Sequence, residues 1–235
     1  MTTDTLTADL AATIEATRRA ERELFGALDD AMLHRPIREG DWNPKDFQAH
    51  LTAWKSRQAD RYAALREGRE LPPATEEEDE VNAAFREARV SWTWEAITAE
   101  ANQVADRLVE EIRAADPHAL RASDRLIGGT FGNGALHTLT HLRWLLEAGV
   151  ALDAARVHGF ADETMSMVRA PSLPDRDKAI GAYDLACFYA LAGRPDDARP
   201  LLRDAFRLSP DLVAFSKTDV DLVSLVDEVD ALAAR

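Results

Sequence analysis

Three histidines are the residues whose type and spacing could do chemistry. His137 and His141 lie four residues apart within residues 133–141, and His50 lies within residues 46–54. If both stretches are helical, the i, i+4 pair places two imidazoles on one side of a helix, one turn apart. A third imidazole from a facing helix would complete a three-nitrogen site that leaves coordination positions open on a divalent metal.

The chemistry of such a site depends on its neutral donors. Imidazole is a common ligand for zinc, nickel and iron, and the sequence does not choose among these metals. Three neutral ligands would leave the cation strongly Lewis acidic, so a thiol or water at an open position would lose its proton. Thiol conjugation and hydrolysis of an electrophile both remain open. The competing interpretation is three partly buried histidines with ordinary hydrogen bonds.

Polar residues near His50 are further candidates for the site. Asp46 lies four residues before His50 and could orient its imidazole, although stabilisation of a helix N-terminus explains Asp46 better. Arg57 and Arg61 follow His50 on the same helical line. They could hold a carboxylate of a substrate or of a thiol cofactor, or they could pair with surface acids.

Two more residues belong with these candidates. Trp54 could line a pocket beside the histidines or pack in the core. Asn133 could contribute to the site, although a role as the cap of a helix is the stronger interpretation. An HExxH zinc motif is absent because Thr138 follows His137, and no glycine-rich phosphate loop occurs.

Composition and periodicity predict helices that would position these residues. The 235 residues include only 11 glycines and 10 prolines, and apolar residues recur at helical spacing. Four long amphipathic helices with one longer connection predict an all-α four-helix bundle over residues 1–153. These helices are expected over about 5–33, from Pro44 to about Leu65, from a Ser91 cap to about Ile112, and from Thr130 or Asn133 to about Asp153. A short helix carrying Val81, Asn82 and Phe85 is expected in the connection.

The remainder of the chain predicts a linker with partial helix over 154–178 and a second unit over 179–235. Residues 179–212 resemble one tetratricopeptide repeat, with a turn at Gly193-Arg194 and small residues where two helices would meet, and residues 220–234 would form a capping helix. A single repeat cannot bury its own apolar face. We therefore expect this unit to dock on the bundle, on a second copy in a homodimer, or on a protein partner.

The net charge and the number of cysteines argue against several classes of binding partner and site. A formal net charge of −14 opposes binding to nucleic acid or to an anionic membrane surface. The single cysteine, Cys187, excludes an internal disulfide framework and a thiolate-rich zinc site. The first residues show no secretory signal, and no apolar stretch reaches the roughly 18 residues of a membrane span, so a cytoplasmic protein is expected.

Residues 5–153 resemble the DinB-like superfamily. The resemblance is carried by three segments in order: Asp-Trp-Asn-Pro-Lys-Asp at 41–46 leading to Ala-His-Leu at 49–51 and Trp54, Val-Asn at 81–82, and Gly-Asn at 132–133 leading to His137 and His141. It implies a bundle that holds a divalent metal through His50, His137 and His141. Similar proteins include thiol S-transferases that use a small thiol such as mycothiol or bacillithiol, isomerases, and hydrolases that open strained rings. The resemblance thus implies an enzyme acting on a reactive small molecule; the alternative is a non-catalytic module that binds a ligand, or a protein through the repeat-like tail.

Overall fold

The structure is a computed structural model, and it describes residues 5–37, 41–72, 78–123 and 125–234. The described residues form helices and no β-strand, which confirms the all-α class. Backbone contacts divide the chain into a first unit, Met1–Phe160, and a second unit, Ala161–Arg235. The boundary between the units falls inside one helix, α9 (Ala154–Val168).

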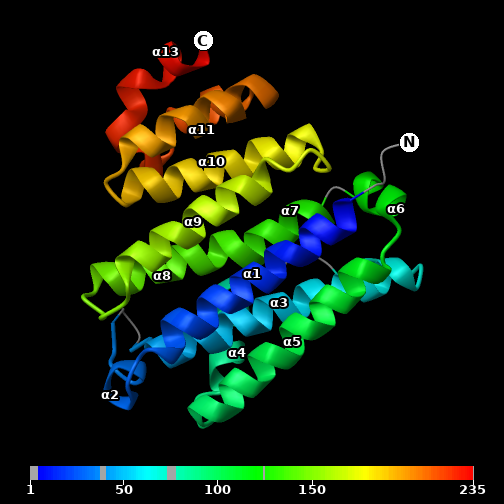
Figure 1. Cartoon of the computed structure of the whole chain (residues 1–235), viewed down its shortest axis with the longest axis vertical. Helices are drawn as coiled ribbons and strands as arrows, with labels where there is room; N and C mark the ends of the chain where they lie inside the picture. The colour runs from blue at the N-terminus through cyan, green and yellow to red at the C-terminus, as the bar shows by residue number, and fades with distance from the viewer. Residues whose placement is uncertain (1–4, 38–40, 73–77, 124, 235) are drawn as a thin grey trace. The chain divides into compact units, whose positions relative to one another are not determined.

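Long helices lying side by side form the bundle of the first unit (Figure 1). They are α1 (Leu6–Gly26), α3 (Pro44–Arg66), α5 (Trp94–Ala114) and a fourth segment, kinked at Gly134, made of α7 (Leu126–Phe131), η1 (Gly132–Leu136) and α8 (His137–Glu147). The short helices α2 (Asp30–Leu33), α4 (Glu78–Glu87) and α6 (Pro117–Ala122) lie in the connections. Each long helix turns an apolar stripe inward, and its buried members include Leu10, Ile14, Phe25, Phe47, Leu51, Tyr62, Ile97, Leu108, Ile112 and Leu139.

Capping side chains set the ends of these helices. Asn43 and Asp46 form a reciprocal capping box at the start of α3, with Pro44 at the first helical position, as the sequence predicts. The predicted first helix over 5–33 is wrong beyond Gly26, because the Asp29 side chain accepts a hydrogen bond from the Met32 amide and begins α2. The predicted Ser91 cap is also wrong, since Thr93 caps α5.

The second unit contains the C-terminal half of α9, then α10 (Asp175–Leu191), α11 (Pro195–Leu208), α12 (Leu212–Ser216), the 3₁₀ helix η2 (Val220–Glu228) and α13 (Val229–Ala233). Helices α10 and α11 pair across a turn at Gly193, whose φ of +71° suits glycine. Ala186, Ala198 and Ala205 are fully buried, as expected for two closely packed helices. The predicted capping helix over 220–234 is mostly 3₁₀ in form.

The apolar face of the α10–α11 pair has neighbours within its own unit. A Cβ atom on Gly181 would lie 3.0 Å from the Val168 side chain, and the Tyr189 hydroxyl donates to Asp162; both partners belong to α9. Leu222, Leu225, Val229 and Leu232 are buried as well. Classification as a tetratricopeptide repeat, homodimer formation and a protein partner stay predictions.

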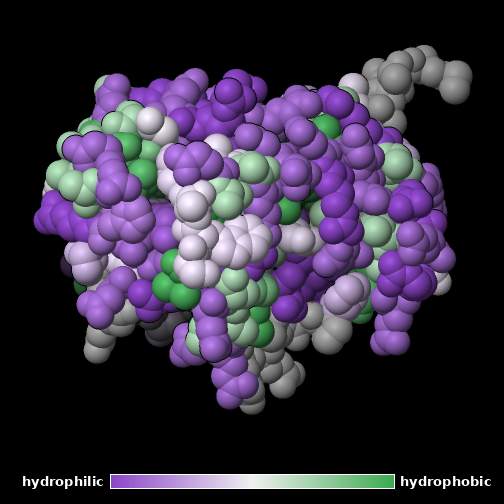
Figure 2. All heavy atoms as spheres, turned by 90° about the horizontal axis from the view of Figure 1, so that it is seen from below, coloured by the Kyte–Doolittle hydropathy of each residue, from purple (hydrophilic) through white to green (hydrophobic). Residues whose placement is uncertain are grey.

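The hydropathy of the surface reflects the high proportion of charged residues in the chain. The face in Figure 2 is covered mainly by hydrophilic residues, and hydrophobic residues form smaller patches. Such a mixture is expected when 30% of the residues are charged. No helix among the described residues combines the length and the apolar character that a bilayer crossing requires.

Candidate metal centre

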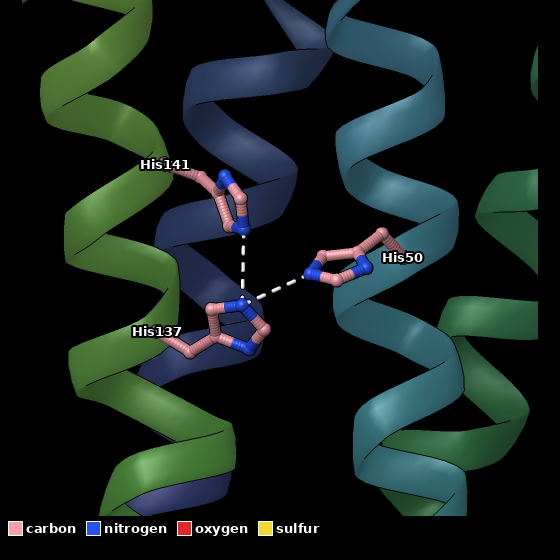
Figure 3. A group of neighbouring side chains, drawn as sticks. All are labelled: His50, His137 and His141. Carbon is pink, nitrogen blue, oxygen red and sulfur yellow. Dashed lines mark hydrogen bonds between the residues drawn. The ribbon is translucent and has the colours of Figure 1, made fainter. Parts of the chain in front are cut away.

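The three predicted histidines meet inside the bundle of the first unit. His50 projects from the second turn of α3, and His137 and His141 project from successive turns of α8 toward it (Figure 3). The Nε2 atom of His137 lies 3.0 Å from Nε2 of His50 and 3.0 Å from Nε2 of His141. All three ligand atoms lie within 4.8 Å of one another. His50 and His141 are buried, and His137 is half-buried.

Two of the three separations between ring nitrogens match the spacing of neighbouring ligands on one divalent cation. A neutral ring nitrogen carries either one hydrogen or one lone pair, so Nε2 of His137 cannot make two well-directed hydrogen bonds at once. A cation at about 2.0–2.1 Å from each nitrogen would hold neighbouring ligand nitrogens roughly 3.0–3.4 Å apart. The two separations of 3.0 Å fall at the edge of that range, and the third, between His50 and His141, is bounded by 4.8 Å. Nδ1 of His50 is buried and has no hydrogen-bond partner among the described residues, so the outer acceptor typical of a metal-ligating histidine is not found for this ring.

Burial and a nearby positive charge lower the pKa values of His50 and His137 and keep these two imidazoles neutral. Burial and then the positive charge of Lys55 lower the pKa of His50 to about 4. Burial, with His50 and Lys55, also holds the pKa of His137 well below its ordinary value. A neutral imidazole presents the lone pair that a metal requires, so both rings are in the ligating form at neutral pH.

Aromatic side chains wall the histidines on several sides. The ring of Trp42 lies 5.5 Å from that of His50, and Phe47 and Trp144 lie 4.6 and 4.7 Å from His141. Trp54 is 6.4 Å from both His50 and His137. An apolar shell of this kind limits water access and strengthens electrostatic interactions within it.

Asp46 and Trp54 form hydrogen bonds with side chains of α4. Asp46 takes part in the capping box and accepts a hydrogen bond of 3.1 Å from Arg86 of α4, and none of the hydrogen bonds among the described residues joins it to His50. The buried Trp54 indole donates to Asn82 of α4 at 3.0 Å. These contacts hold α4 along the side of α3 that carries His50.

The remaining predicted residues lie farther along the same helices. The Arg57 guanidinium lies 5.4 Å from the centre of the Trp54 ring, and Arg61 follows one turn later on α3. Asn133 lies inside the π-helical segment η1, half-buried, and so does not cap the start of a helix. The fourth long helix begins at Leu126, earlier than its sequence predicts.

A kink in the backbone lies one turn before His137. Gly134 has non-helical angles (φ −99°, ψ −106°), so two helices meet within Gly132–Leu136. Within it, an added Cβ atom on Gly134 would lie 3.0 Å from Cδ1 of Ile14, whereas one on Gly132 would meet nothing within 4 Å. Gly134 therefore lets the segment approach α1 closely.

We expect Gly134→Ala to be less stable than Gly132→Ala by roughly 1–3 kcal/mol, the usual cost of overpacking a tight contact. Both variants add one methyl group to the same segment, and only the one at Gly134 meets Ile14 and falls at the kink, so their difference reports these two features together. Urea unfolding of the two proteins measures it. Equal midpoints would show that Ile14 moves aside without cost.

A buried ionic cluster that the sequence did not reveal holds together the helices of the site. Glu21 of α1 is buried and pairs with the buried Lys55 of α3. Glu21 also accepts a hydrogen bond of 2.8 Å from Thr138, the residue after His137, and one of 3.4 Å from Gln48. One carboxylate thus ties together the two helices that carry the histidines.

The charge of Glu21 is maintained by its neighbours. Burial raises the pKa of its carboxyl, but Lys55, Arg18 and Thr138 together outweigh burial and hold the pKa below its ordinary value. Arg18 is itself anchored to Asn102 of α5 at 2.8 Å. The cluster therefore joins all four long helices around an ionised carboxylate. Charged residues on an amphipathic helix ordinarily mark its solvent-exposed face. Sequence periodicity therefore did not predict that these charged residues are buried.

Comparison with known proteins supports one family. The sequence profile of the DinB superfamily matches residues 13–147, which is more than half of the chain and includes all three histidines. No curated protein and no solved structure gives a significant match. The matched range extends from α1 to the end of α8, so it covers the helices that build the site. The chain belongs to the DinB superfamily.

Proposed function

We propose that His50, His137 and His141 hold a divalent cation, and that the first unit is a metal-dependent enzyme that joins a low-molecular-weight thiol to a reactive small molecule. The observation that carries this proposal is the convergence of three Nε2 atoms from two helices, with two separations of 3.0 Å. Zinc, nickel and iron all suit three imidazole donors.

The residues around the site would contribute in distinct ways. A bound cation would supply a Lewis acid that lowers the pKa of a thiol or water reaching its open positions. The positive charge of Lys55, which already disfavours protonated His50 and His137, also favours a negatively charged thiolate at the same place. The aromatic wall would hold the apolar part of an electrophile and exclude bulk water.

Styrene oxide with cysteine tests this proposal and separates it from hydrolysis. Attack by thiol sulfur forms a C–S bond, breaks one epoxide C–O bond and gives a hydroxy thioether, whereas attack by water gives a diol. We expect thioether formation, followed by mass spectrometry, in untagged protein loaded with zinc, nickel or iron, and at least a hundredfold less in His50→Ala. A diol product instead would favour the alternative of a hydrolase that opens strained electrophiles.

An exposed histidine outside the triad supplies the matched control. His118 lies at the surface on α6, and His118→Ala should retain the rate of the wild type. Absence of both products at every metal, or equal rates in His50→Ala and wild type, would contradict a catalytic role for the triad.

A further inference from the structure

The contacts of helix α4 are concentrated around the candidate metal site. None of its side chains at residues 79–87 is buried, so α4 adds little to the core of the bundle. Its half-buried residues share one face at helical spacing and are Val81, Asn82, Phe85 and Arg86. Three of them contact the two tryptophans beside His50. The face of α4 therefore acts on the surroundings of the site more than on the core.

Two contacts from α4 fix the Trp54 ring, which lies 6.4 Å from the rings of both His50 and His137. The indole N–H of Trp54 donates to the side-chain oxygen of Asn82 at 3.0 Å. The Phe85 ring meets the same indole edge to face, with 6.0 Å between the ring centres. An indole has a single donor, so a buried indole faces the acceptor that satisfies it. Asn82 thus sets the orientation of Trp54.

Arg86 of α4 holds the second tryptophan beside His50. Its guanidinium lies 5.3 Å from the centre of the Trp42 ring, and that ring lies 5.5 Å from His50. The same guanidinium donates to the Asp46 carboxylate at 3.1 Å and to the Asp41 carbonyl at 2.9 Å. Asp41 has a φ of +58°, a left-handed conformation that is unfavourable for most residues other than glycine. Arg86 therefore stabilises the turn that presents Trp42 to His50.

We propose that Asn82 and Arg86 are positioning residues that fix Trp54 and Trp42 and thereby determine which electrophile the site accepts. Two indole rings in fixed orientations offer flat apolar surfaces, which favour an electrophile with an aromatic group over a small aliphatic one. This inference rests on the proposed function for the reaction, whereas the placement of the two rings does not require a metal.

Hydrogen exchange at the Trp54 indole, followed by NMR of the isotope-labelled full chain, tests the role of Asn82. The signal is identified by its loss in Trp54→Phe. We expect slow exchange in the wild type and much faster exchange in Asn82→Leu, because the acceptor is lost. Asn82→Asp keeps an acceptor oxygen and should restore slow exchange. Equal exchange in the wild type and Asn82→Leu would overturn the role of Asn82.

Titration of the metal-free protein with benzyl alcohol and, separately, with ethanol tests the preference for an aromatic group. We expect benzyl alcohol to shift the indole signals of Trp42 and Trp54 saturably in the wild type, and ethanol to leave them unchanged. Binding of benzyl alcohol should be about tenfold weaker in Asn82→Leu and in Arg86→Gln, which is the upper range for one lost hydrogen bond.

Arg89→Gln is the matched control. Like Arg86, Arg89 donates to a carboxylate, that of Glu100 at 2.7 Å, and stacks on a tryptophan, Trp92, at 5.6 Å. This variant should bind benzyl alcohol as the wild type does. Equal weakening in Arg89→Gln, or no saturable shift in the wild type, would overturn the role in specificity.

The same measurements with zinc distinguish this inference from the proposed function. A chain in which the two tryptophans depend on Asn82 and Arg86, but which binds no metal, refutes only the catalytic function. A chain that binds zinc and converts styrene oxide at equal rates in the wild type, Asn82→Leu and Arg86→Gln refutes only the positioning role.

Discussion

Replacing His137 by alanine is expected to weaken zinc binding by more than about 100-fold, which exceeds the usual loss when an outer partner of a metal ligand is removed. His137 supplies the nitrogen that lies 3.0 Å from both other ligands, so its removal leaves only two donors. Competition with a chromophoric chelator measures the affinity. Because His137 is only half-buried, the variant should keep the helical circular dichroism of the wild type.

Control variants distinguish the loss of a metal ligand from a disturbance of side-chain packing. The exposed His118→Ala variant should bind zinc like the wild type. Unchanged affinity in His137→Ala with intact helical content would mean that the cation, if bound, sits elsewhere.

Glu21→Ala is expected to lower the free energy of unfolding by about 3–5 kcal/mol at pH 7, the typical cost of breaking a buried ion pair on one side. The variant would leave Lys55 and Arg18 buried without their carboxylate and would remove the acceptor for Thr138. Urea unfolding measures the change. Glu15→Ala is the control on the same helix: Glu15 forms a surface pair with Arg113 at 2.7 Å, worth about 0–1 kcal/mol.

A second substitution and the pH dependence of stability test whether the loss of stability is electrostatic. Adding Lys55→Met to Glu21→Ala should recover part of the loss, because the stranded ammonium is removed. The folded-state pKa of Glu21 is lowered, so its contribution is present above the unfolded-state value and disappears as the pH falls through the folded value. The difference in stability between wild type and Glu21→Gln should therefore shrink in acid. A constant difference, with no recovery from Lys55→Met, would contradict an electrostatic role.

Local signals in the sequence were sufficient for the start of α3, which bears His50, but not for the start of the fourth long helix. Asn43, Pro44 and Asp46 mark the start of α3 because capping depends on residues within one turn. The i, i+4 spacing of His137 and His141 places both on one face whatever the tertiary structure. Convergence with His50 could be predicted only as a consequence of bundle packing.

Other features depend on contacts between distant segments. The pairing of Glu21 with Lys55 and Thr138 joins residues 34 and 117 positions apart, which periodicity cannot detect. The kink at Gly134 lies where this residue approaches Ile14 of α1, a contact that local sequence patterns do not reveal. Thr93 caps α5 although Ser91 has a similar propensity, so residue type alone could not decide between them.

Metal analysis of untagged protein, combined with X-ray absorption spectroscopy, tests the central claim most directly. The account predicts close to one divalent ion per chain, surrounded by three imidazole nitrogens at about 2.0–2.1 Å if it is zinc, and no ion in the variant that replaces His50, His137 and His141 by alanine. A wild type that stays free of metal after incubation with zinc, nickel and iron, or a triple variant that binds the same amount, would contradict it.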